Sequence, residues 1–277
     1  YDISGATFVD AFSVSSQETS PQGLAFSTDG TKMFVAGASG DDVNEYALST
    51  GFDISTASFT DAFSVAAQDT LPTGLAFNTD GTKMFVVGYT GQDINEYALT
   101  TGFDVSTASF TDAFSVAAQD TQPTSVAFNT DGTKMFVLGF TGDDVNEYAL
   151  STGFDVSTAS FTDSFSVSAQ DTGPTGLAFN TDGTKMFIAG DIGDSVYKYS
   201  LSTGFDVSTA SFTDSFNVSA QTTGPRNLAF NADGTKMFIV GNAGENVNEY
   251  TVTQTTFVTT VKAGQAISAT TINMKDL

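Results

Sequence analysis

The side chains with the widest use in catalysis are missing from this sequence, which has no histidine and no cysteine. The usual general base, thiolate nucleophiles and the commonest zinc ligands are therefore excluded. Carboxylates are the remaining candidates, since 32 acidic residues stand against 9 basic ones. Among the copies of the repeat described below, Asp191 is the one acid without an acidic counterpart. A lone Asp without a partner is a poor catalyst, so we expect no catalytic residue and no enzyme.

Paired carboxylates offer the best candidate for a metal site. Asp41-Asp42 and Asp143-Asp144 each follow a glycine at equivalent places in two copies of the repeat. Carboxylate oxygens are the ligands that Ca²⁺ prefers, so these pairs could hold that ion. The alternative is a solvated acidic loop, and the spaced acids of an EF-hand are missing. The sequence therefore predicts no cofactor other than this Ca²⁺.

The acidic and aromatic residues belong to a repeat of 51 residues that occurs five times. The octapeptide NTDGTKMF stands at 78–85, 129–136 and 180–187, with near copies at 27–34 and 231–238. Such a period is typical of repeat architectures in which each unit is stabilised by its neighbours. One position of the repeat is a phenylalanine in every copy: Phe26, Phe77, Phe128, Phe179 and Phe230.

Each copy predicts four strands. In the copy at 52–102 these are ASFTDAFSV, TGLAF, KMFVV and INEYAL, which are rich in Phe, Val and Ile. Asp-Gly between the second and third is a hairpin signal, and the continuous apolar run KMFVV predicts a sheet covered on both faces. Four antiparallel strands per unit indicate an all-β, five-bladed β-propeller.

The N-terminal segment is expected to close the ring. Residues 1–14 repeat the outermost strand ahead of any inner strand, while the last copy lacks its own outer strand. We therefore predict a propeller over 1–252 in which 1–14 is the outer strand of the last blade. The alternative gives that place to 257–261. Residues 253–277 fall outside the repeat and are expected to be a linker or the start of a further element.

In each copy the outer strand carries one aspartate that has two possible roles: Asp10, Asp61, Asp112, Asp163 and Asp214. These carboxylates could be five metal ligands. Because every copy has one, we favour a bulge or edge position where each Asp accepts from backbone N–H groups or meets the lysine of the repeat.

The stretch NTDGTKMFVVG resembles the "SPDG-x-x-x-Y/F-V" hairpin of YVTN-like propeller repeats. The whole unit resembles repeat proteins of marine bacteria and their phages, which are secreted or virion-associated. This resemblance covers residues 1–252 and implies a propeller, with no catalytic motif shared by the family. The Trp-Asp pair of WD repeats is missing.

The copies differ mainly in two sets of loops, which a propeller places on one face. Loops on a rigid scaffold commonly carry recognition, and exposed aromatics are typical anchors. The alternative is neutral drift at tolerant loop tips. The predicted partner-binding residues are Tyr89, Phe140, Asp191, Asn242, Arg226, Leu71 and Gln122.

These features predict a non-catalytic binding or structural module that is extracellular or part of a virion: a phage fibre, appendage or decoration protein, or a bacterial surface protein. Its expected partner is a protein of a larger assembly or a cell-surface glycan. The alternative is a lectin that binds about one glycan per blade through the Asn-Glu-Tyr strand. A net charge of −23 argues against nucleic acid, and no apolar run is long enough for membrane insertion.

Overall fold

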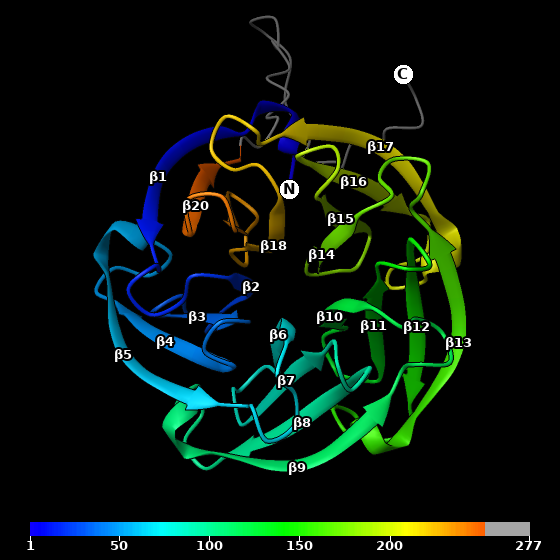
Figure 1. Ribbon diagram of the computed structural model, residues 1–277. Helices are drawn as coiled ribbons and strands as arrows, with labels where there is room; N and C mark the ends of the chain where they lie inside the picture. Colours follow the sequence, from blue (N-terminus) through cyan, green and yellow to red (C-terminus); the bar gives the residue numbers. More distant parts are fainter. Residues whose placement is uncertain (253–277) are drawn as a thin grey trace, which may run out of the picture.

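The computed structural model describes residues 1–252, which form five four-stranded antiparallel sheets around a central channel (Figure 1). The tail at 253–277, including the alternative closing strand at 257–261, lies outside the described residues. The predicted all-β, five-bladed propeller is confirmed. The other regular elements of the described part are short 3-10 turns at Ile3–Gly5, Ile54–Thr56, Val105–Thr107, Val156–Thr158 and Val207–Thr209.

Each blade runs from an inner strand at the channel to an outer strand at the rim. Blade 1 consists of β2 (Pro21–Phe26), β3 (Lys32–Gly37), β4 (Asp42–Leu48) and β5 (Ala57–Ser64). Blade 2 consists of β6 (Pro72–Phe77), β7 (Lys83–Gly88), β8 (Asp93–Leu99) and β9 (Ala108–Ser115). Blade 3 consists of β10 (Pro123–Phe128), β11 (Lys134–Gly139), β12 (Asp144–Leu150) and β13 (Ala159–Ser166).

Blade 4 consists of β14 (Pro174–Phe179), β15 (Lys185–Gly190), β16 (Ser195–Leu201) and β17 (Ala210–Asn217). Blade 5 joins the two ends of the ring: β18 (Pro225–Phe230), β19 (Lys236–Gly241), β20 (Asn246–Thr251) and β1 (Thr7–Ser13). Figure 1 shows the blue β1 beside the orange β20, which it pairs with in antiparallel register. The predicted closure by the N-terminal strand is thus confirmed.

The core lies between the blades, and the second strand of each blade contributes to two neighbours. Met33 and Val35 of β3 pack with Phe238 and Val240 of blade 5, whereas Phe34 packs on the other side with blade 2. All of these side chains are fully buried. Because successive side chains of a strand point to opposite faces, one apolar run fills two interfaces. Near-identical blades therefore give near-identical interfaces, which explains why the sequence repeats.

The NTDG turn needs its glycine for two reasons. Gly81 has a φ of +72°, and a Cβ there would lie 2.3 Å from the ring of Phe103. Asp80 closes the turn by accepting from the backbone N–H of Thr82 at 3.0 Å and from its hydroxyl at 2.6 Å. The predicted hairpin is confirmed, and its Asp is a turn residue.

The aspartate of each outer strand lies at a β-bulge. In blade 1 the register shifts between Glu45 and Tyr46, and Asp61 accepts from the backbone N–H of Ala62 at 2.8 Å. Asp61 is exposed. A bulge with an outward charge protects a sheet edge from pairing with another chain. The bulge interpretation is confirmed.

The lysine of the repeat meets a glutamate rather than that aspartate. In blade 2, Lys83 Nζ lies 2.7 Å from Glu96 Oε1 and donates to the carbonyl of Phe154 at 2.6 Å. The other oxygen of Glu96 accepts from the backbone N–H of Val156 at 3.1 Å. Since residues 154 and 156 lie between β12 and β13 of blade 3, this pair fastens one blade to the next. In blade 4 a lysine, Lys198, replaces the glutamate and lies 3.7 Å from Asp2.

Replacing Glu96 with Gln should lower the free energy of unfolding by about 1.5–3 kcal/mol, because Lys83 loses its partner carboxylate and Val156 N–H a charged acceptor. Urea denaturation measures this change. The matched control is Asp61→Asn, an exposed carboxylate whose loss should cost less than about 0.5 kcal/mol. Equal effects of the two substitutions would contradict the inter-blade role of Glu96.

Candidate functional site

The inner strands place a ring of five equivalent residues at one mouth of the channel: Gln22, Thr73, Thr124, Thr175 and Arg226. The three threonines repeat one contact, since each hydroxyl donates to the proline carbonyl of the next inner strand at 2.7–3.3 Å. Arg226 breaks this pattern and is the only arginine of the chain. The ring is therefore neutral except at blade 5.

The next position along these strands is glycine in three blades and polar in two. Ser125 and Asn227 are buried, and the hydroxyl of Ser125 accepts from the side chain of Asn227 at 3.3 Å and from the backbone N–H of Leu177 at 3.2 Å. One residue further on, each strand buries a leucine or valine. The polar ring at the mouth thus lies above a satisfied polar layer and then an apolar one.

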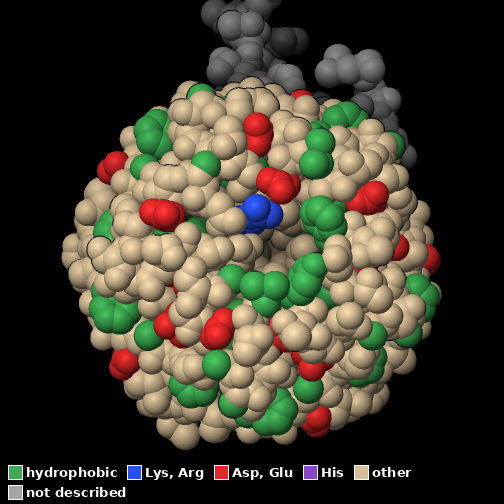
Figure 2. Space-filling model, in the orientation of Figure 1, with side chains coloured by type: hydrophobic (Ala, Val, Ile, Leu, Met, Phe, Trp, Pro, Cys, Tyr) green, Lys and Arg blue, Asp and Glu red, His purple; other side chains and the backbone are tan. Residues whose placement is uncertain are grey.

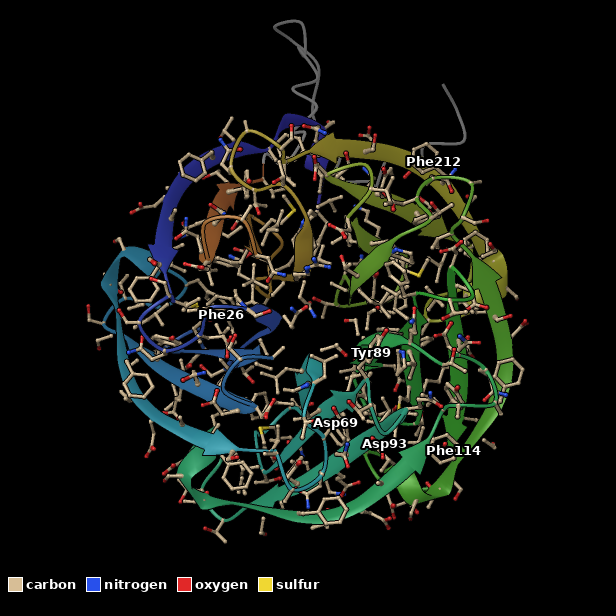
Figure 3. The ribbon with its side chains drawn as sticks, viewed as in Figure 1. Phe26, Asp69, Tyr89, Asp93, Phe114 and Phe212 are labelled. Atoms are coloured by element: carbon tan, nitrogen blue, oxygen red, sulfur yellow. The ribbon has the colours of Figure 1, made fainter. Side chains whose placement is uncertain are left out.

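A cavity of about 190 Å³ opens at this mouth. The two variable loop sets meet there because the backbone ties them together: Tyr89 N–H donates to the Leu71 carbonyl at 3.2 Å, and Phe140 N–H to the Gln122 carbonyl at 3.0 Å. Figure 3 shows Tyr89 close to the channel, whereas Phe212 lies at the rim on β17. The lining residues are Gln22, Leu71, Thr73, Tyr89, Gln122, Thr124, Phe140, Thr175 and Arg226.

Asp191 follows β15 and approaches Arg226 from the neighbouring blade. Its Oδ2 lies 3.4 Å from Arg226 Nη1, and the two side chains are 28% and 26% exposed. With its amide oriented to satisfy both contacts, Asn242 accepts from Arg226 Nε at 3.1 Å and donates to the Pro21 carbonyl at 3.0 Å. The expectation that Asp191 has no partner is therefore wrong, because the fold brings Arg226 to it from 35 residues along the chain.

Five of the seven residues predicted from loop variation line this cavity: Leu71, Tyr89, Gln122, Phe140 and Arg226. Asp191 and Asn242 do not line it but contact Arg226 from behind, so the polar side of the cavity lies at blade 5, while Leu71, Tyr89 and Phe140 form an apolar wall from blades 2 and 3. On this face Figure 2 shows basic side chains only beside the central hollow, with hydrophobic ones across from them. A site with one cation, one reachable carboxylate and an aromatic wall can polarise a carbonyl and position a small ring.

Sequence reasoning missed the buried acids that brace these loops. Asp69 is 3% exposed and accepts from the backbone N–H groups of Leu71 and Gly91, both at 2.6 Å. It therefore fixes the two loops that carry Leu71 and Tyr89. Equivalent buried residues are Glu18, Asp120, Asp171 and, in blade 5, Thr222. The signal in the sequence was an acidic residue directly after a glutamine in four copies of the repeat, whereas the last copy has Thr222 at that position.

In three blades a second acidic residue lies beside the buried acid that holds the loops. Asp93 lies near Asp69 (Figure 3), and burial, together with the charge of Asp69, raises the pKa of Asp93 above its ordinary 3.8. Burial likewise raises the pKa of Asp42 and of Asp144. In contrast, hydrogen bonds from the threonine two residues later lower the pKa of the turn aspartates, which are Asp29, Asp80, Asp131, Asp182 and Asp233.

These opposite shifts predict a stability optimum near the ordinary aspartate pKa of 3.8. A carboxyl with a raised folded pKa contributes stability that is lost as pH rises through that value, whereas one with a lowered pKa contributes stability that is lost as pH falls below 3.8. We expect the thermal midpoint to rise as the pH falls from neutral towards 3.8 and to fall again below that value. Calorimetry across this range measures it, and Asp93→Asn should flatten the alkaline limb. A midpoint that rises steadily to pH 8 would contradict the assignment.

The acidic pairs predicted to hold Ca²⁺ lie in separate blades. Asp42 Oδ1 accepts from Asn44 at 2.7 Å, and Asp144 Oδ1 accepts from Asn146 at 2.7 Å. Asp41 and Asp143 take left-handed backbone conformations in the turn before each strand. Among residues 1–252 no three acidic side chains gather closely enough to form a metal site. Binding of Ca²⁺ at these loops stays a prediction.

The strand proposed to bind glycans is not available for that purpose. Asn95 and Tyr97 are 2% and 0% exposed, and they contact Asp93 and Gln68 inside the fold. The lectin alternative is wrong, because alternate residues of this strand face the two neighbouring blades rather than an open cleft. Within the described part of the chain, no helix is long and apolar enough to span a bilayer.

Comparison with known proteins identifies a family. The family described as lactonase, 7-bladed beta-propeller matches residues 48–276. The propeller prediction agrees with this match, but the likeness to YVTN-like repeats of phages does not. The match also overturns the prediction of a non-catalytic module and of a protein that is not an enzyme. Five sheets are present over residues 1–252, against the seven blades of the family's description. No curated protein matches the chain.

Solved structures share the fold at low identity. A candidate 6-phosphogluconolactonase from Bacteroides uniformis is 15% identical with a TM-score of 0.50, covering 83% of this chain and 71% of its own. A protein from Lactobacillus plantarum is 17% identical with a TM-score of 0.50, over 84% of this chain and 67% of that one. A protein of unknown function from Desulfotomaculum acetoxidans is 12% identical with a TM-score of 0.48, over 80% of this chain. The chain spans 62% of the length of that last protein.

Proposed function

Since the chain belongs to the lactonase family of β-propellers, we propose that it hydrolyses a lactone at the channel mouth lined by Arg226. The observation that carries the proposal is the ion pair of Asp191 with Arg226, 3.4 Å apart, in which Arg226 lines the cavity. Here the repeat acquires an acid and a cation that the other blades lack. In the reaction, water adds to the carbonyl carbon, the ring C–O bond breaks, and a hydroxy acid forms.

Arg226 is suited to stabilise the negative charge that develops on the carbonyl oxygen. Its guanidinium stays charged at all relevant pH values and presents donors in a fixed plane. Asn242 and Asp191 hold it from two sides, so little reorganisation is needed when charge develops. In this proposal Arg226 acts as the oxyanion hole.

Asp191 is suited to accept a proton from the attacking water. It is 28% exposed, which leaves its side chain accessible to water beside Arg226. The proton taken from water passes to the ring oxygen as the C–O bond breaks, so that Asp191 returns to its starting state and the product leaves as a hydroxy acid. No histidine is required for this sequence of steps, and the chain has none.

A pH-stat assay tests the proposal with wild type and Arg226→Gln. The substrates are an unsubstituted lactone, an alkyl-substituted lactone and 6-phosphogluconolactone, the compound implied by the name of the Bacteroides uniformis neighbour. We expect wild type to exceed the buffer rate on at least one of them, and Arg226→Gln to lower kcat by about 10²–10³-fold.

The control for this assay is Lys198→Gln, which removes one positive charge from β16, where Lys198 pairs with Asp2. Its rate should stay within about twofold of wild type, because the charge lies outside the cavity. A wild-type rate equal to that of buffer on all three lactones would contradict the proposed function. So would an Arg226→Gln variant as active as wild type.

A further inference from the structure

Resting on the proposed function, we infer that the site selects a neutral lactone with an apolar substituent and rejects a phosphorylated sugar lactone. The cavity has one polar wall, which suits a carbonyl group, and one apolar wall, which suits a hydrocarbon group. Charge, lining and volume each support this inference.

The charge of the site is too low for a phosphate. Among residues 1–252, Arg226 is the only basic residue that lines the cavity, and Asp191 already forms an ion pair with it at 3.4 Å. A phosphate carries a charge near −2 and is usually held by several charge-assisted hydrogen bonds. The lysines of the repeat do not line the cavity, and four of the five are bound to buried glutamates and to loop carbonyls: Lys32, Lys83, Lys134 and Lys236.

The charge of the whole chain acts in the same direction. A net charge of −23 produces a field that lowers the local concentration of anions and slows their association. A neutral substrate is unaffected by this field, and its hydroxy acid product, once ionised, is repelled from the cavity. The electrostatics therefore disfavour an anionic substrate and favour release of an anionic product.

The opposite wall favours an apolar group over a sugar. Leu71, Tyr89 and Phe140 present hydrocarbon and aromatic surface, and each is half-buried. Sugar hydroxyls placed against this wall would lose water without gaining a partner. A volume of about 190 Å³ corresponds to about six waters at ~30 Å³ each, which suits one small ring with a short chain.

Kinetics and binding test the inference separately from the proposed function. We compare kcat/KM for a butyl-substituted lactone and 6-phosphogluconolactone, and measure by calorimetry the binding of the matching butyl lactam and of 6-phosphogluconate. We expect at least about a tenfold preference for the butyl compounds in both measurements, with a KM that does not change with salt. Phe140→Ala should weaken lactam binding about tenfold, whereas Phe8→Ala, an exposed ring at the rim, should not.

The outcomes separate the two claims. A preference for the phosphorylated compounds, or equal loss of both ligands in Phe140→Ala, would overturn the inference while leaving lactone hydrolysis intact. Lactam binding without hydrolysis of any lactone would uphold the inferred ligand class and overturn the proposed function. Binding of neither ligand would overturn the inference.

Discussion

Replacing Asp191 with Asn should lower kcat/KM for the preferred lactone by about 10²–10³-fold without unfolding the protein. The amide keeps the size of the side chain and can still contact Arg226, but it cannot accept a proton from water. Asp191 is partly exposed at a loop tip, so the thermal midpoint should stay nearly unchanged. Initial rates in a pH-stat and a thermal scan of the same sample measure both quantities.

The matched control is Asp41→Asn, which makes the same chemical change in the equivalent loop of blade 1. Asp41 has a φ of +51°, a conformation that Asn tolerates, and unlike Asp191 it forms no ion pair with Arg226. We expect this variant to retain activity within about twofold. Full activity of Asp191→Asn would assign proton transfer to another group and contradict the mechanism. A parallel loss in both variants would point to a general effect of charge on the loops.

The largest effect on stability should come from deleting residues 1–13, which removes β1. Ile3 and Ala6 are buried in the interface between blades 4 and 5, and Phe12 packs against the next interface. The terminal amine of Tyr1 also donates to the Gly234 carbonyl at 2.8 Å. Each large apolar side chain contributes about 1.5–3 kcal/mol of stability when it is buried. The summed loss therefore approaches the whole free energy of unfolding of a typical domain, which is roughly 5–15 kcal/mol.

Urea denaturation of the deletion variant should therefore show a transition that is broad or already complete in buffer. The control is Val9→Ser on the same strand, whose side chain is 51% exposed and whose loss should cost less than about 0.5 kcal/mol. An unchanged midpoint for the deletion variant would mean that another segment closes the ring, as the alternative with 257–261 supposed. That result would contradict closure by β1.

The ring could be predicted because its physical requirements recur in every copy. The apolar run Lys83–Gly88 predicts a strand covered on both faces, and Asp-Gly predicts a hairpin turn in each copy. Counting strands placed β1 on β20, since a missing outer strand at one end matched a surplus one at the other. These predictions need only the local pattern of apolar and turn residues and the number of strands per copy, both of which a single sequence provides.

The contacts between blades could not be predicted in the same way. Glu96 accepts from the backbone N–H of Val156, which is 60 residues away in the next blade. Neither local sequence indicates how the loop that carries Val156 is placed against Glu96. The pair of Asp191 and Arg226 shows the same limit, because Asp191 lies in the loop after β15 of blade 4 and Arg226 lies on β18 of blade 5. Each was singled out by its difference from the other copies. Their contact, and with it the case for catalysis, depends on how closely the loop of one blade approaches the inner strand of the next.

The most direct test of the account is a crystal structure of the protein with the butyl lactam bound. We expect one molecule at the channel mouth, with its carbonyl oxygen on Arg226, its butyl group on Tyr89 and Phe140, and Asp191 facing the carbonyl carbon across a water. A lactam bound at the opposite mouth, or one whose carbonyl faces away from Arg226, would contradict the claim that lactone chemistry takes place at this site.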